Sequence, residues 1–523
     1  MIEERGIVYL VGAGPGDPGL LTRRGADLLA QANVVVYDHL ASASLLELAP
    51  RQAIFICAGK SSGHCTLRQE EINEILVEHA KAGRIVVRLK GGDPLVFGRG
   101  AEEAEFLARH QARFEIVPGV TAAVGVSAYA GIPVTHRAYS SAVAFVTGHG
   151  EPETSTAPEV EGVLQASRAP RLDWRALAQF PGTLVVYMGV TRLEAICRTL
   201  IRLGKAGATP AAVIENGSLP AQRVFEGSLE TISDLARSAG LHPPALLVVG
   251  PVVRCRDALR WYEALPLFGQ RILITRPLEE GRRSAASLES MGAEVLLAPS
   301  VEILPLTDHG SLDAAIARLA EYQWLVFTSS NGVRFFLDRL EKQGRDLRVL
   351  GHIKLAAIGP GTAQALGQFR LRADLVPAEY HSEGLAKALA AHASGCKILL
   401  ARADRGRTVL KDELEHVAKV DQVAVYRNAD ASSLPDEVLK RLGAGTVDWI
   451  TLTSSAITAR LHALLPEDVH GRIGHGIKLA SISPITSRAA AELGWKVDVE
   501  APTATWEALI HAIAGASSPA RRS

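Results

Sequence analysis

Glycine residues follow the first strand-like run of the chain at a spacing that could bind a phosphorylated ligand. The segment VGAGPGDPG (11–19) contains G-x-G-x-x-G after the apolar run 7–11, and Asp38 ends the next strand-like run, VVVYD. This arrangement resembles a nicotinamide-dinucleotide site, in which the acidic residue binds a ribose. Two prolines within the segment, however, remove amides that a pyrophosphate cradle would use. We therefore expect a ligand-binding turn here that is not a dinucleotide site.

A second glycine turn follows a strand-like run in VVRLKGGDPLVFGRG (86–100). Gly91 and Gly92 allow unusual backbone angles and close approach of a ligand, while Asp93 supplies an acceptor. The alternative is an ordinary glycine-rich turn. Further short turns follow at VPGVTAAVGVSAYAGIPVTHR (117–137), VTGHG (146–150), YMG (187–189) and ENGS (215–218).

The second half of the chain contains an internal repeat. RILITRPLEEG at 271 returns as KILLARADRG at 397, and WLVFTSSNGV at 324 returns as WITLTSSAI at 449. AAIGPGTAQALG, which begins at 356, returns as ASISPITSRAAAELG at a similar offset. Similar Val-rich strands alone would not repeat Thr-Ser-Ser and Pro-x-Thr. We therefore predict two related lobes around a cleft, a usual place for a ligand.

The elements that must position these residues alternate between strand-like and helix-like runs. Apolar strand-sized runs are separated by stretches rich in Ala, Leu and Glu, such as 68–82 and 101–110. This alternation predicts α/β layers. We expect a domain boundary with a linker at 263–270, an irregular insertion at 150–171 and a disordered tail at 515–523.

Composition narrows the class of protein. The 523 residues carry 56 Lys plus Arg and 56 Asp plus Glu, giving a net charge of 0, with 47% hydrophobic and 21% charged residues. These values argue against extensive disorder and against nucleic-acid binding by bulk basicity. Five cysteines without a C-x-x-C pair argue against a disulfide framework or a metal site. Without a signal-like or membrane-length apolar segment, we expect a cytoplasmic protein.

Residues 6–262 resemble the uroporphyrinogen-III C-methyltransferases, of the class III tetrapyrrole methyltransferases. The resemblance rests on GAGPGDPGLLT, VVYD, the GK block, RLKGGDP with FGRG, and GIPVTHR, in the family's order. It implies two α/β lobes around an S-adenosylmethionine pocket. The implied cofactor-binding residues are backbone turns and small or soft side chains: Pro15, Gly91, Gly92, Asp93, Val96, Thr121, Ala122, Met188 and Gly217.

The same resemblance implies catalytic and substrate-binding residues. Asp38 and Lys60 match the proposed proton acceptor and donor, although Lys60 could instead bind a substrate carboxylate. Methyl transfer to a pyrrole carbon needs alignment of carbon, methyl and sulfur, and a proton must later leave. A substrate with eight carboxylates also needs local cations, unless these are only solvated surface residues: Arg88, Lys90, Arg99, His136 and Arg137. Cys65, where the family usually has His, and Leu95, where it has Phe, depart from its pattern.

Residues 271–514 resemble uroporphyrinogen-III synthase. The supporting segments are TRP (275–277), FTSSNGV (327–333), AIGPGTA (357–363), YHSE (380–383), RADRGR (402–407) and VYR (425–427). The resemblance implies one lobe of 271–301 with 430–514 and another of 305–425, joined by strands near 301–304 and 423–427. Tyr426 matches a proposed acid and Thr486 a cleft threonine, although Ser483 replaces a family glycine. Residues after strands could hold carboxylates or only cap helices: Thr328, Ser329, Asn331, Thr453 and Ser454.

The two resemblances together imply a bifunctional tetrapyrrole enzyme. Its second half would cyclise hydroxymethylbilane to uroporphyrinogen III, and its first half would methylate that product twice to precorrin-2, towards siroheme or cobalamin. One alternative is a methyltransferase for a later corrin intermediate. Another gives the second half a non-catalytic, ligand-binding or regulatory role. We expect a homodimer formed through the first half, no metal, and no nucleic-acid or membrane partner.

Overall fold

The computed structural model describes residues 6–59, 67–148, 172–406 and 408–517. They divide into two compact units. The first takes the described residues up to Gln270 together with the short segment Glu289–Glu294, and the second takes Arg271–Leu288 and Val295–Ala516. Each unit contains two five-stranded sheets, so the α/β fold class expected from the sequence is confirmed.

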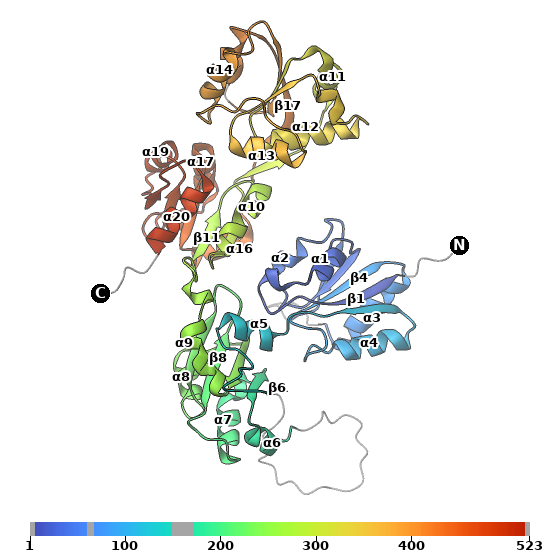
Figure 1. The fold of residues 1–523 in the computed structure, drawn as a ribbon, viewed down its shortest axis with the longest axis vertical. Helices are drawn as coiled ribbons and strands as arrows, with labels where there is room; N and C mark the ends of the chain where they lie inside the picture. The colour runs from blue at the N-terminus through green and yellow to red at the C-terminus, as the bar shows by residue number, and fades with distance from the viewer. Residues whose placement is uncertain (1–5, 60–66, 149–171, 407, 518–523) are drawn as a thin grey trace. The chain divides into compact units, whose positions relative to one another are not determined.

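The first sheet is parallel, with the order β3-β2-β4-β1-β5. Its central strands are apolar on both faces because helices cover both: α3 and α4 pack on one face, and α1 and α2 on the other (Figure 1). The carboxyl ends of the strands therefore share one open edge. The elements are β1 (Ile7–Gly12), α1 (Arg23–Leu29), β2 (Val34–Tyr37), α2 (Ala43–Leu46), β3 (Ile54–Cys57), α3 (Gln69–Lys81), β4 (Ile85–Lys90), α4 (Gly100–Arg109) and β5 (Arg113–Val117).

The second sheet is mixed, with the order β6-β7-β10-β8-β9. β6 runs parallel to β7, whereas β10 runs antiparallel to both β7 and β8. The helix α5 contributes Ala123 and Val126 to the core on one face, and α6, α7 and α8 cover the other. The elements are α5 (Ala122–Tyr129), β6 (Val143–Thr147), α6 (Trp174–Gln179), β7 (Thr183–Tyr187), α7 (Leu193–Arg202), β8 (Pro210–Glu215), β9 (Arg223–Ser228), α8 (Ile232–Ser238), β10 (Ala245–Val249) and α9 (Arg256–Leu259).

One sheet of the second unit combines strands from both of its ends, in the order β12-β11-β18-β19-β20. Its strands are short and fully buried at the centre, as in Trp449–Leu452. The elements that build it and flank it are β11 (Arg271–Ile274), α10 (Leu278–Glu289), β12 (Glu294–Leu297), α16 (Asp436–Gly443), β18 (Trp449–Leu452), α17 (Ser455–Leu464), α18 (Glu467–His470), β19 (Lys478–Ser481), α19 (Pro484–Glu492), β20 (Val499–Glu500) and α20 (Trp506–Ser517).

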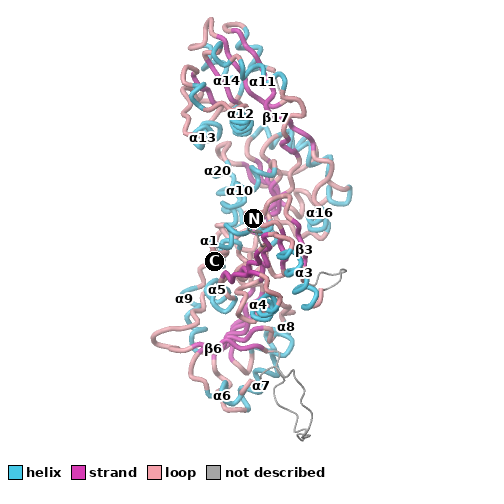
Figure 2. Tube along the Cα trace, turned by 90° about the vertical axis from the view of Figure 1, so that its right-hand side faces the viewer, coloured by secondary structure: helices cyan, strands magenta, loops and turns pink. Residues whose placement is uncertain are grey.

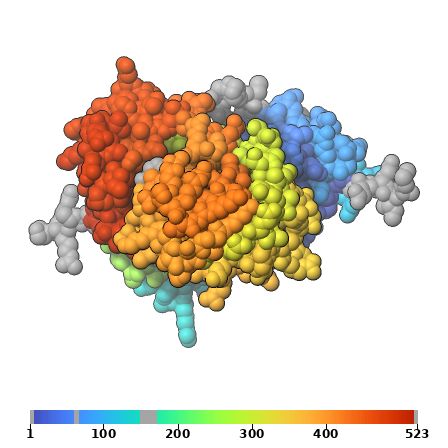
Figure 3. Space-filling view, turned by 90° about the horizontal axis from the view of Figure 1, so that it is seen from above, coloured from blue at the N-terminus to red at the C-terminus, as the bar shows by residue number. Residues whose placement is uncertain are grey.

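The other sheet of the second unit has the order β13-β17-β16-β14-β15. The long strand β17 pairs in parallel with β16 and then in antiparallel with β13. Helices α11, α12 and α14 lie around these strands (Figure 2), and the segment forms one continuous yellow-to-orange body (Figure 3). The elements are β13 (Val301–Leu304), α11 (Gly310–Ala317), β14 (Trp324–Phe327), α12 (Ser330–Lys342), β15 (Lys354–Ala357), α13 (Pro360–Gln368), α14 (Ser382–Ala390), β16 (Lys397–Ala403), α15 (Val409–Glu415) and β17 (Lys419–Asp430).

The internal repeat recurs in this unit as matching side-chain contacts. The N–H of Leu355 donates to Asp374 at 2.7 Å, and the N–H of Leu479 donates to Asp498 at 2.8 Å. Each aspartate thus bridges two adjacent segments at the same point of its own sheet. Three further pairs of contacts repeat: Ser330–Gly361 with Ser455–Ile485, Lys397–Gln323 with Arg271–Asp448, and Lys354–Trp324 with Lys478–Trp449.

The segment expected as a linker, 263–270, is packed against the first unit. Leu267 is buried, and its N–H donates to the carbonyl of Met291. Helix α20 continues to Ser517, three residues into the stretch expected as a disordered tail. The insertion expected at 150–171 falls within 149–171, outside the described residues. No helix in the described ranges has the length and apolar character needed to cross a bilayer.

Candidate active sites

The open edge of the first sheet brings the catalytic candidate Asp38 to the glycine turn. Asp38 follows β2, and its N–H donates to the carbonyl of Leu89 on neighbouring β4 at 3.2 Å. A side chain built at Gly91 would place its Cβ 3.0 Å from the Cβ of Leu40. Asp38 therefore lies beside the turn that contains Gly91, as the order of parallel strands requires.

The Gly91–Gly92 turn is joined to the first glycine turn by backbone hydrogen bonds. The N–H of Gly92 donates to the carbonyl of Gly14 at 2.7 Å, and the reverse bond measures 3.2 Å. Gly92 has a φ of +69°, yet a Cβ built on it would meet no atom closer than the Ala122 nitrogen, at 3.7 Å. Backbone conformation rather than crowding therefore requires this glycine.

The carboxylate of Asp93 is held by backbone amides. Its Oδ1 accepts from the N–H of Leu95 at 2.8 Å and its Oδ2 from the N–H of Gly119 at 3.0 Å. The carbonyl of Asp93 accepts from Val96 at 3.3 Å. Asp93 therefore fixes the shape of the turn after β4 and joins it to the segment that precedes α5.

Tyr187, at the end of β7, connects the second sheet to the start of α5. Its hydroxyl lies 2.6 Å from the hydroxyl of Thr121 and accepts from the N–H of Ala123 at 2.7 Å. The ring of Phe97, from the turn after β4, packs 4.9 Å from the ring of Tyr187. Met188 follows directly and is 44% exposed. Tyr187 thus brings Thr121 and Met188 to the Gly92 turn.

Pro15 and Gly217, the last two of the implied cofactor-binding residues, lie against the middle of α5. A Cβ at Gly125 would lie 2.7 Å from the ring of Pro15, and a Cβ at Gly217 would lie 2.2 Å from Val126. The N–H of Asp17 also donates to Ser218 at 3.3 Å. All nine implied cofactor-binding residues therefore lie in one region of the first unit, around α5 and the Gly92 turn.

Backbone strain concentrates in this same region. Seven residues other than glycine have positive φ in the described ranges, and five belong to the turns just described: Phe97, Arg99, Met188, Asn216 and Ser218. Such conformations persist only where the surrounding structure holds them, and they cluster at ligand sites. The strained turns and the exposed Met188 mark this region as a candidate ligand site.

Arg88 and Lys90, expected to bind substrate, are buried and bound to other residues of the protein. Lys90 Nζ lies 2.8 Å from Glu103 Oε1, and Arg88 contacts the same oxygen through Nε at 3.3 Å. Arg88 also donates through Nη2 to Asp38 at 2.5 Å. The expected cation cluster is therefore not formed. Because Arg88 and Lys90 are two residues apart in β4, their side chains point to the same face of the sheet, where Glu103 of α4 is their counterion.

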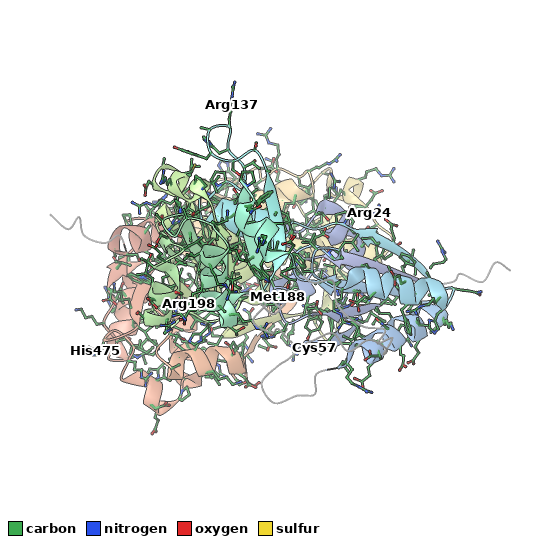
Figure 4. The ribbon with its side chains drawn as sticks, turned by 90° about the horizontal axis from the view of Figure 1, so that it is seen from below. Arg24, Cys57, Arg137, Met188, Arg198 and His475 are labelled. Atoms are coloured by element: carbon green, nitrogen blue, oxygen red, sulfur yellow. The ribbon has the colours of Figure 1, made fainter. Side chains whose placement is uncertain are left out.

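The other three implied substrate cations lie on the surface. Arg99 forms a bidentate pair with Glu102, whose closest contact is 2.6 Å. His136 and Arg137 are exposed on a short hairpin, from which Arg137 projects away from the ribbon (Figure 4). Lys60 lies outside the described residues. The described structure thus places Asp38 at the candidate site and leaves the substrate cations dispersed.

Sequence reasoning missed two residues that organise this site. Tyr187 immediately precedes Met188 in the quoted YMG segment, so its position was available although its hydrogen bonds were not. Glu103 lies in AEEAEF after the FGRG turn, where nothing distinguishes it from its exposed neighbour Glu102. A buried cation pair on β4 would have required such a carboxylate, but burial is not readable from the sequence alone.

In the second unit, Tyr426 is buried on β17 and hydrogen-bonded. Its hydroxyl lies 3.0 Å from the Oγ of Ser329, and its ring stacks on Phe335 with centroids 5.6 Å apart. Burial raises the pKa of Tyr426 above the ordinary tyrosine value, which the Ser329 hydrogen bond partly offsets. Tyr426 therefore remains protonated at neutral pH and able to donate a proton.

Asn331 and the remaining hydroxyl residues occupy the starts of helices. Asn331 is buried, and its Nδ2 donates to Glu280 of α10 at 3.1 Å. Ser329 and Ser454 accept from the backbone N–H groups of Gly332 and Ile457, so both cap helices as the alternative interpretation held. Thr328 and Thr453, one position earlier in each repeat, are partly buried.

Thr486 is buried at the start of α19, and its hydroxyl lies 3.1 Å from the Oγ of Ser483. Ser483 has φ and ψ of −163° and 160°, almost the same as Ser329 and Ser454. The serine that replaces the family glycine is therefore an ordinary helix cap of the repeat. The geometry does not expose Thr486 to a ligand.

No group of three or more His, Cys, Asp or Glu residues in the described ranges is arranged to hold a metal ion. The first unit carries a doubly wound parallel sheet joined through α5 to a mixed sheet, and the second carries duplicated α/β sheets. These features define a chain made of two α/β units, each built from two sheets.

Comparison with known proteins matches each unit to a protein family. Residues 7–233 match the tetrapyrrole (corrin/porphyrin) methylases, and residues 282–511 match uroporphyrinogen-III synthase HemD. The chain is 37% identical over 459 residues to the porphyrin biosynthesis protein HemD of Ruminiclostridium josui, covering 87% of this chain and 88% of that protein. It is 38% identical over 380 residues to the uroporphyrinogen-III C-methyltransferase of Bacillus subtilis, covering 72% and 74%.

Among solved structures, the uroporphyrin-III C-methyltransferase of Thermus thermophilus complexed with S-adenosylhomocysteine is 43% identical, with 47% of this chain and 98% of that chain covered and a TM-score of 0.39. The chain belongs to the family of porphyrin biosynthesis enzymes that fuse a tetrapyrrole methylase to a uroporphyrinogen-III synthase. The resemblance stated from the sequence motifs is confirmed.

Proposed function

We propose that the second unit cyclises hydroxymethylbilane to uroporphyrinogen III and that the first unit methylates this product twice to give precorrin-2. The observation that carries the proposal is the convergence of nine small or soft residues around α5 and the Gly92 turn, next to Asp38. The relatives named for uroporphyrinogen-III C-methylation and porphyrin biosynthesis support the same substrates.

S-adenosylmethionine would be held by the turns around Gly92 and by α5, and when bound it supplies an electrophilic methyl group. The missing side chains at Gly91 and Gly92 would let the ligand approach the backbone, and the exposed Met188 and Phe97 offer apolar surface. Tyr187 fixes the start of α5 through Thr121. These residues align the methyl donor, which is the main task in such a displacement.

Asp38 would accept the proton that the methylated pyrrole must lose. Its side chain is 29% exposed, and Arg88 holds its Oδ1 at 2.5 Å. A positioned carboxylate contributes to such a step as a general base. We keep Lys60 as the partner proton donor, and Arg99, His136 and Arg137 as contacts for substrate carboxylates.

In the second unit, Tyr426 would assist departure of the substrate's hydroxyl group. Its hydroxyl is buried, protonated at neutral pH and oriented by Ser329. Folding a linear tetrapyrrole so that its ends meet is the larger part of the reaction, so few catalytic side chains are needed. The cytoplasmic location and a homodimer formed through the first unit are further parts of this proposal.

The proposal is tested by giving the full-length chain hydroxymethylbilane and S-adenosylmethionine and identifying products by mass and isomer. We expect uroporphyrinogen III with two added methyl groups. Methylation of supplied uroporphyrinogen III, with only the isomer I formed from hydroxymethylbilane, would indicate a non-catalytic second unit. Methylation of precorrin substrates but not of uroporphyrinogen III would indicate a later corrin step and overturn the assignment.

A further inference from the structure

A carboxylate that no motif singled out lies beneath the candidate methyl-transfer site. Glu103, on α4, has no exposed surface. Its Oε1 is contacted by Lys90 Nζ at 2.8 Å, Arg88 Nε at 3.3 Å and Gln69 Nε2 at 3.0 Å. Glu103 thus gathers two cations from β4 and an amide from α3 at a single oxygen.

Burying these charged groups costs folding free energy that a purely structural cluster would not need. Glu103 Oε2 is buried and has no hydrogen-bond partner in the described part of the chain. Burial is also the largest cause lowering the pKa of Lys90, so the ammonium is held where its charge is disfavoured. Buried charges are often replaceable by apolar side chains without loss of stability. An unsatisfied carboxylate oxygen in such a cluster therefore calls for a functional reason.

Arg88 transmits the position of Glu103 to Asp38. Its guanidinium donates through Nε to Glu103, through Nη1 to the Val36 carbonyl at 3.4 Å, and through Nη2 to Asp38 Oδ1 at 2.5 Å. Three acceptors in three directions fix the plane of the guanidinium. Arg88 is 2% exposed whereas the Asp38 side chain is 29% exposed, so Asp38 stands at the boundary between this network and the surface.

Only one oxygen of Asp38 is engaged by the network. Arg88 binds Oδ1, and no described residue donates a hydrogen bond to Oδ2. The cluster contains two cations and two anions, Arg88, Lys90, Glu103 and Asp38, so it is neutral when all four are charged. Arg88 therefore orients Asp38 through one oxygen and leaves the second oxygen available to a proton.

We propose that Glu103 is a positioning residue for methyl transfer: its buried carboxylate holds the Arg88 guanidinium in the orientation that aims Asp38 at the substrate. The role rests on the proposed methyltransferase function and concerns one residue beyond it. Glu103 touches neither substrate nor cofactor and acts through Arg88. Its removal therefore affects the reaction only as far as Asp38 takes part in it.

The test is a double-mutant cycle of Glu103→Gln and Asp38→Asn in the full-length chain, with uroporphyrinogen III and S-adenosylmethionine as substrates. Single-turnover rates are measured, because they remain measurable when steady-state turnover is too slow. Glu103→Gln should lower the methyl-transfer rate about tenfold and change the KM for the tetrapyrrole by less than about twofold. On the Asp38→Asn background it should cause no further loss, since the two residues act as a unit.

Glu103→Gln removes the negative charge that two buried cations share, so a charge-balanced variant accompanies it. Lys90→Met with Glu103→Gln removes one cation and one anion while keeping Arg88 and Asp38. Binding of S-adenosylhomocysteine by calorimetry shows whether the first unit is folded. The Lys90→Met/Glu103→Gln double variant should also slow methyl transfer, with no further loss on the Asp38→Asn background.

A matched control breaks a different ion pair to a buried arginine in the same unit. Glu226 on β9 contacts buried Arg256 at 2.7 Å, and Glu226→Gln should leave the methyl-transfer rate within about twofold. A folded Glu103 variant with an unchanged rate overturns the positioning role. So does a loss that recurs in full on the Asp38→Asn background. Absence of methylation by the wild-type chain would instead overturn the proposed function.

Discussion

The hydroxyl of Tyr187 lies 2.6 Å from the hydroxyl of Thr121 and joins the end of β7 to the first turn of α5. The same oxygen accepts from the N–H of Ala123, which is fully buried. Burial raises the pKa of Tyr187, so the hydroxyl stays neutral and can donate to Thr121 while it accepts from Ala123. One side chain therefore fixes both the helix start and the position of Met188.

Tyr187→Phe should weaken binding of the methyl donor. The ring packing with Phe97 is kept, but Ala123 loses its acceptor, and an unsatisfied buried N–H costs about 1–3 kcal/mol. We expect the Kd for S-adenosylhomocysteine to rise roughly tenfold, measured by calorimetry. Thr121→Val removes the other hydroxyl and leaves the Ala123 bond, so its effect should be smaller. Equal affinity for wild type and Tyr187→Phe would contradict this role.

The sequence predicted the turns of this site better than its charges. The turn at Gly91 and Gly92 was predictable because glycine after a strand permits a positive φ angle, and Gly92 does adopt one. Arg88 and Lys90 were not, because two cations at alternate positions of a strand can face solvent or a buried counterion. Their counterion, Glu103, comes from a separate helix, so only the tertiary packing reveals it.

In the second unit, too, contacts between residues far apart in the sequence could not be predicted. The repeat predicted related halves, and the helix-capping alternative for Ser329 and Ser454 was open from the sequence. The bond between Ser329 and Tyr426 joins residues 97 positions apart and follows from the pairing of β17 with β16. The resemblance implied a cleft threonine at Thr486, with Ser483 as a departure from the family pattern; in the structure Ser483 caps the helix and Thr486 is buried.

Gly217→Ala should destabilise the first unit and reduce cofactor binding. The added Cβ would lie 2.2 Å from Val126 of α5, and overpacking of this kind costs typically about 1–3 kcal/mol. Gly367→Ala, in helix α13, meets no atom within 4 Å and should be neutral or stabilising. Thermal unfolding and S-adenosylhomocysteine binding measure both effects. Val126→Ala should partly rescue Gly217→Ala; failure to rescue would mean that the steric explanation is incorrect.

Cys57 and Cys197 should differ strongly in reactivity towards a thiol-alkylating reagent. Cys57 is exposed at the end of β3, whereas Cys197 is buried in α7, and burial raises the pKa of the Cys197 thiol to about 12. Since the thiolate is the reactive form, Cys197 should stay unmodified at pH 8 until the protein unfolds. Peptide mapping by mass spectrometry, with and without denaturant, compares the two sites. Labelling of Cys197 in the native protein would contradict its buried position.

Tyr426→Phe should slow hydroxymethylbilane cyclisation about a hundredfold, the range of a lost general acid, and leave methyl transfer unchanged. Because burial raises the pKa of Tyr426, its ionisation should cause no loss of cyclisation below about pH 10. The matched control is Tyr322→Phe, which loses a 2.6 Å bond to Asp421 in the same sheet. That variant should lower stability by about 1 kcal/mol without slowing cyclisation. An equal slowing by both variants would assign Tyr426 a structural role.

Asp374→Ala and Asp498→Ala should have matching local effects, because each aspartate accepts from one backbone N–H at an equivalent place in the repeat. Loss of one such bond costs about 0.5–1.5 kcal/mol. Hydrogen exchange of the peptides containing Leu355 and Leu479 measures the two sites separately, which a single unfolding curve of a multi-sheet chain does not. We expect faster exchange at Leu355 only in the first variant and at Leu479 only in the second. If one substitution accelerated exchange at both leucines, the two sheets would be coupled in their opening and could not be treated as independently stabilised copies of one unit.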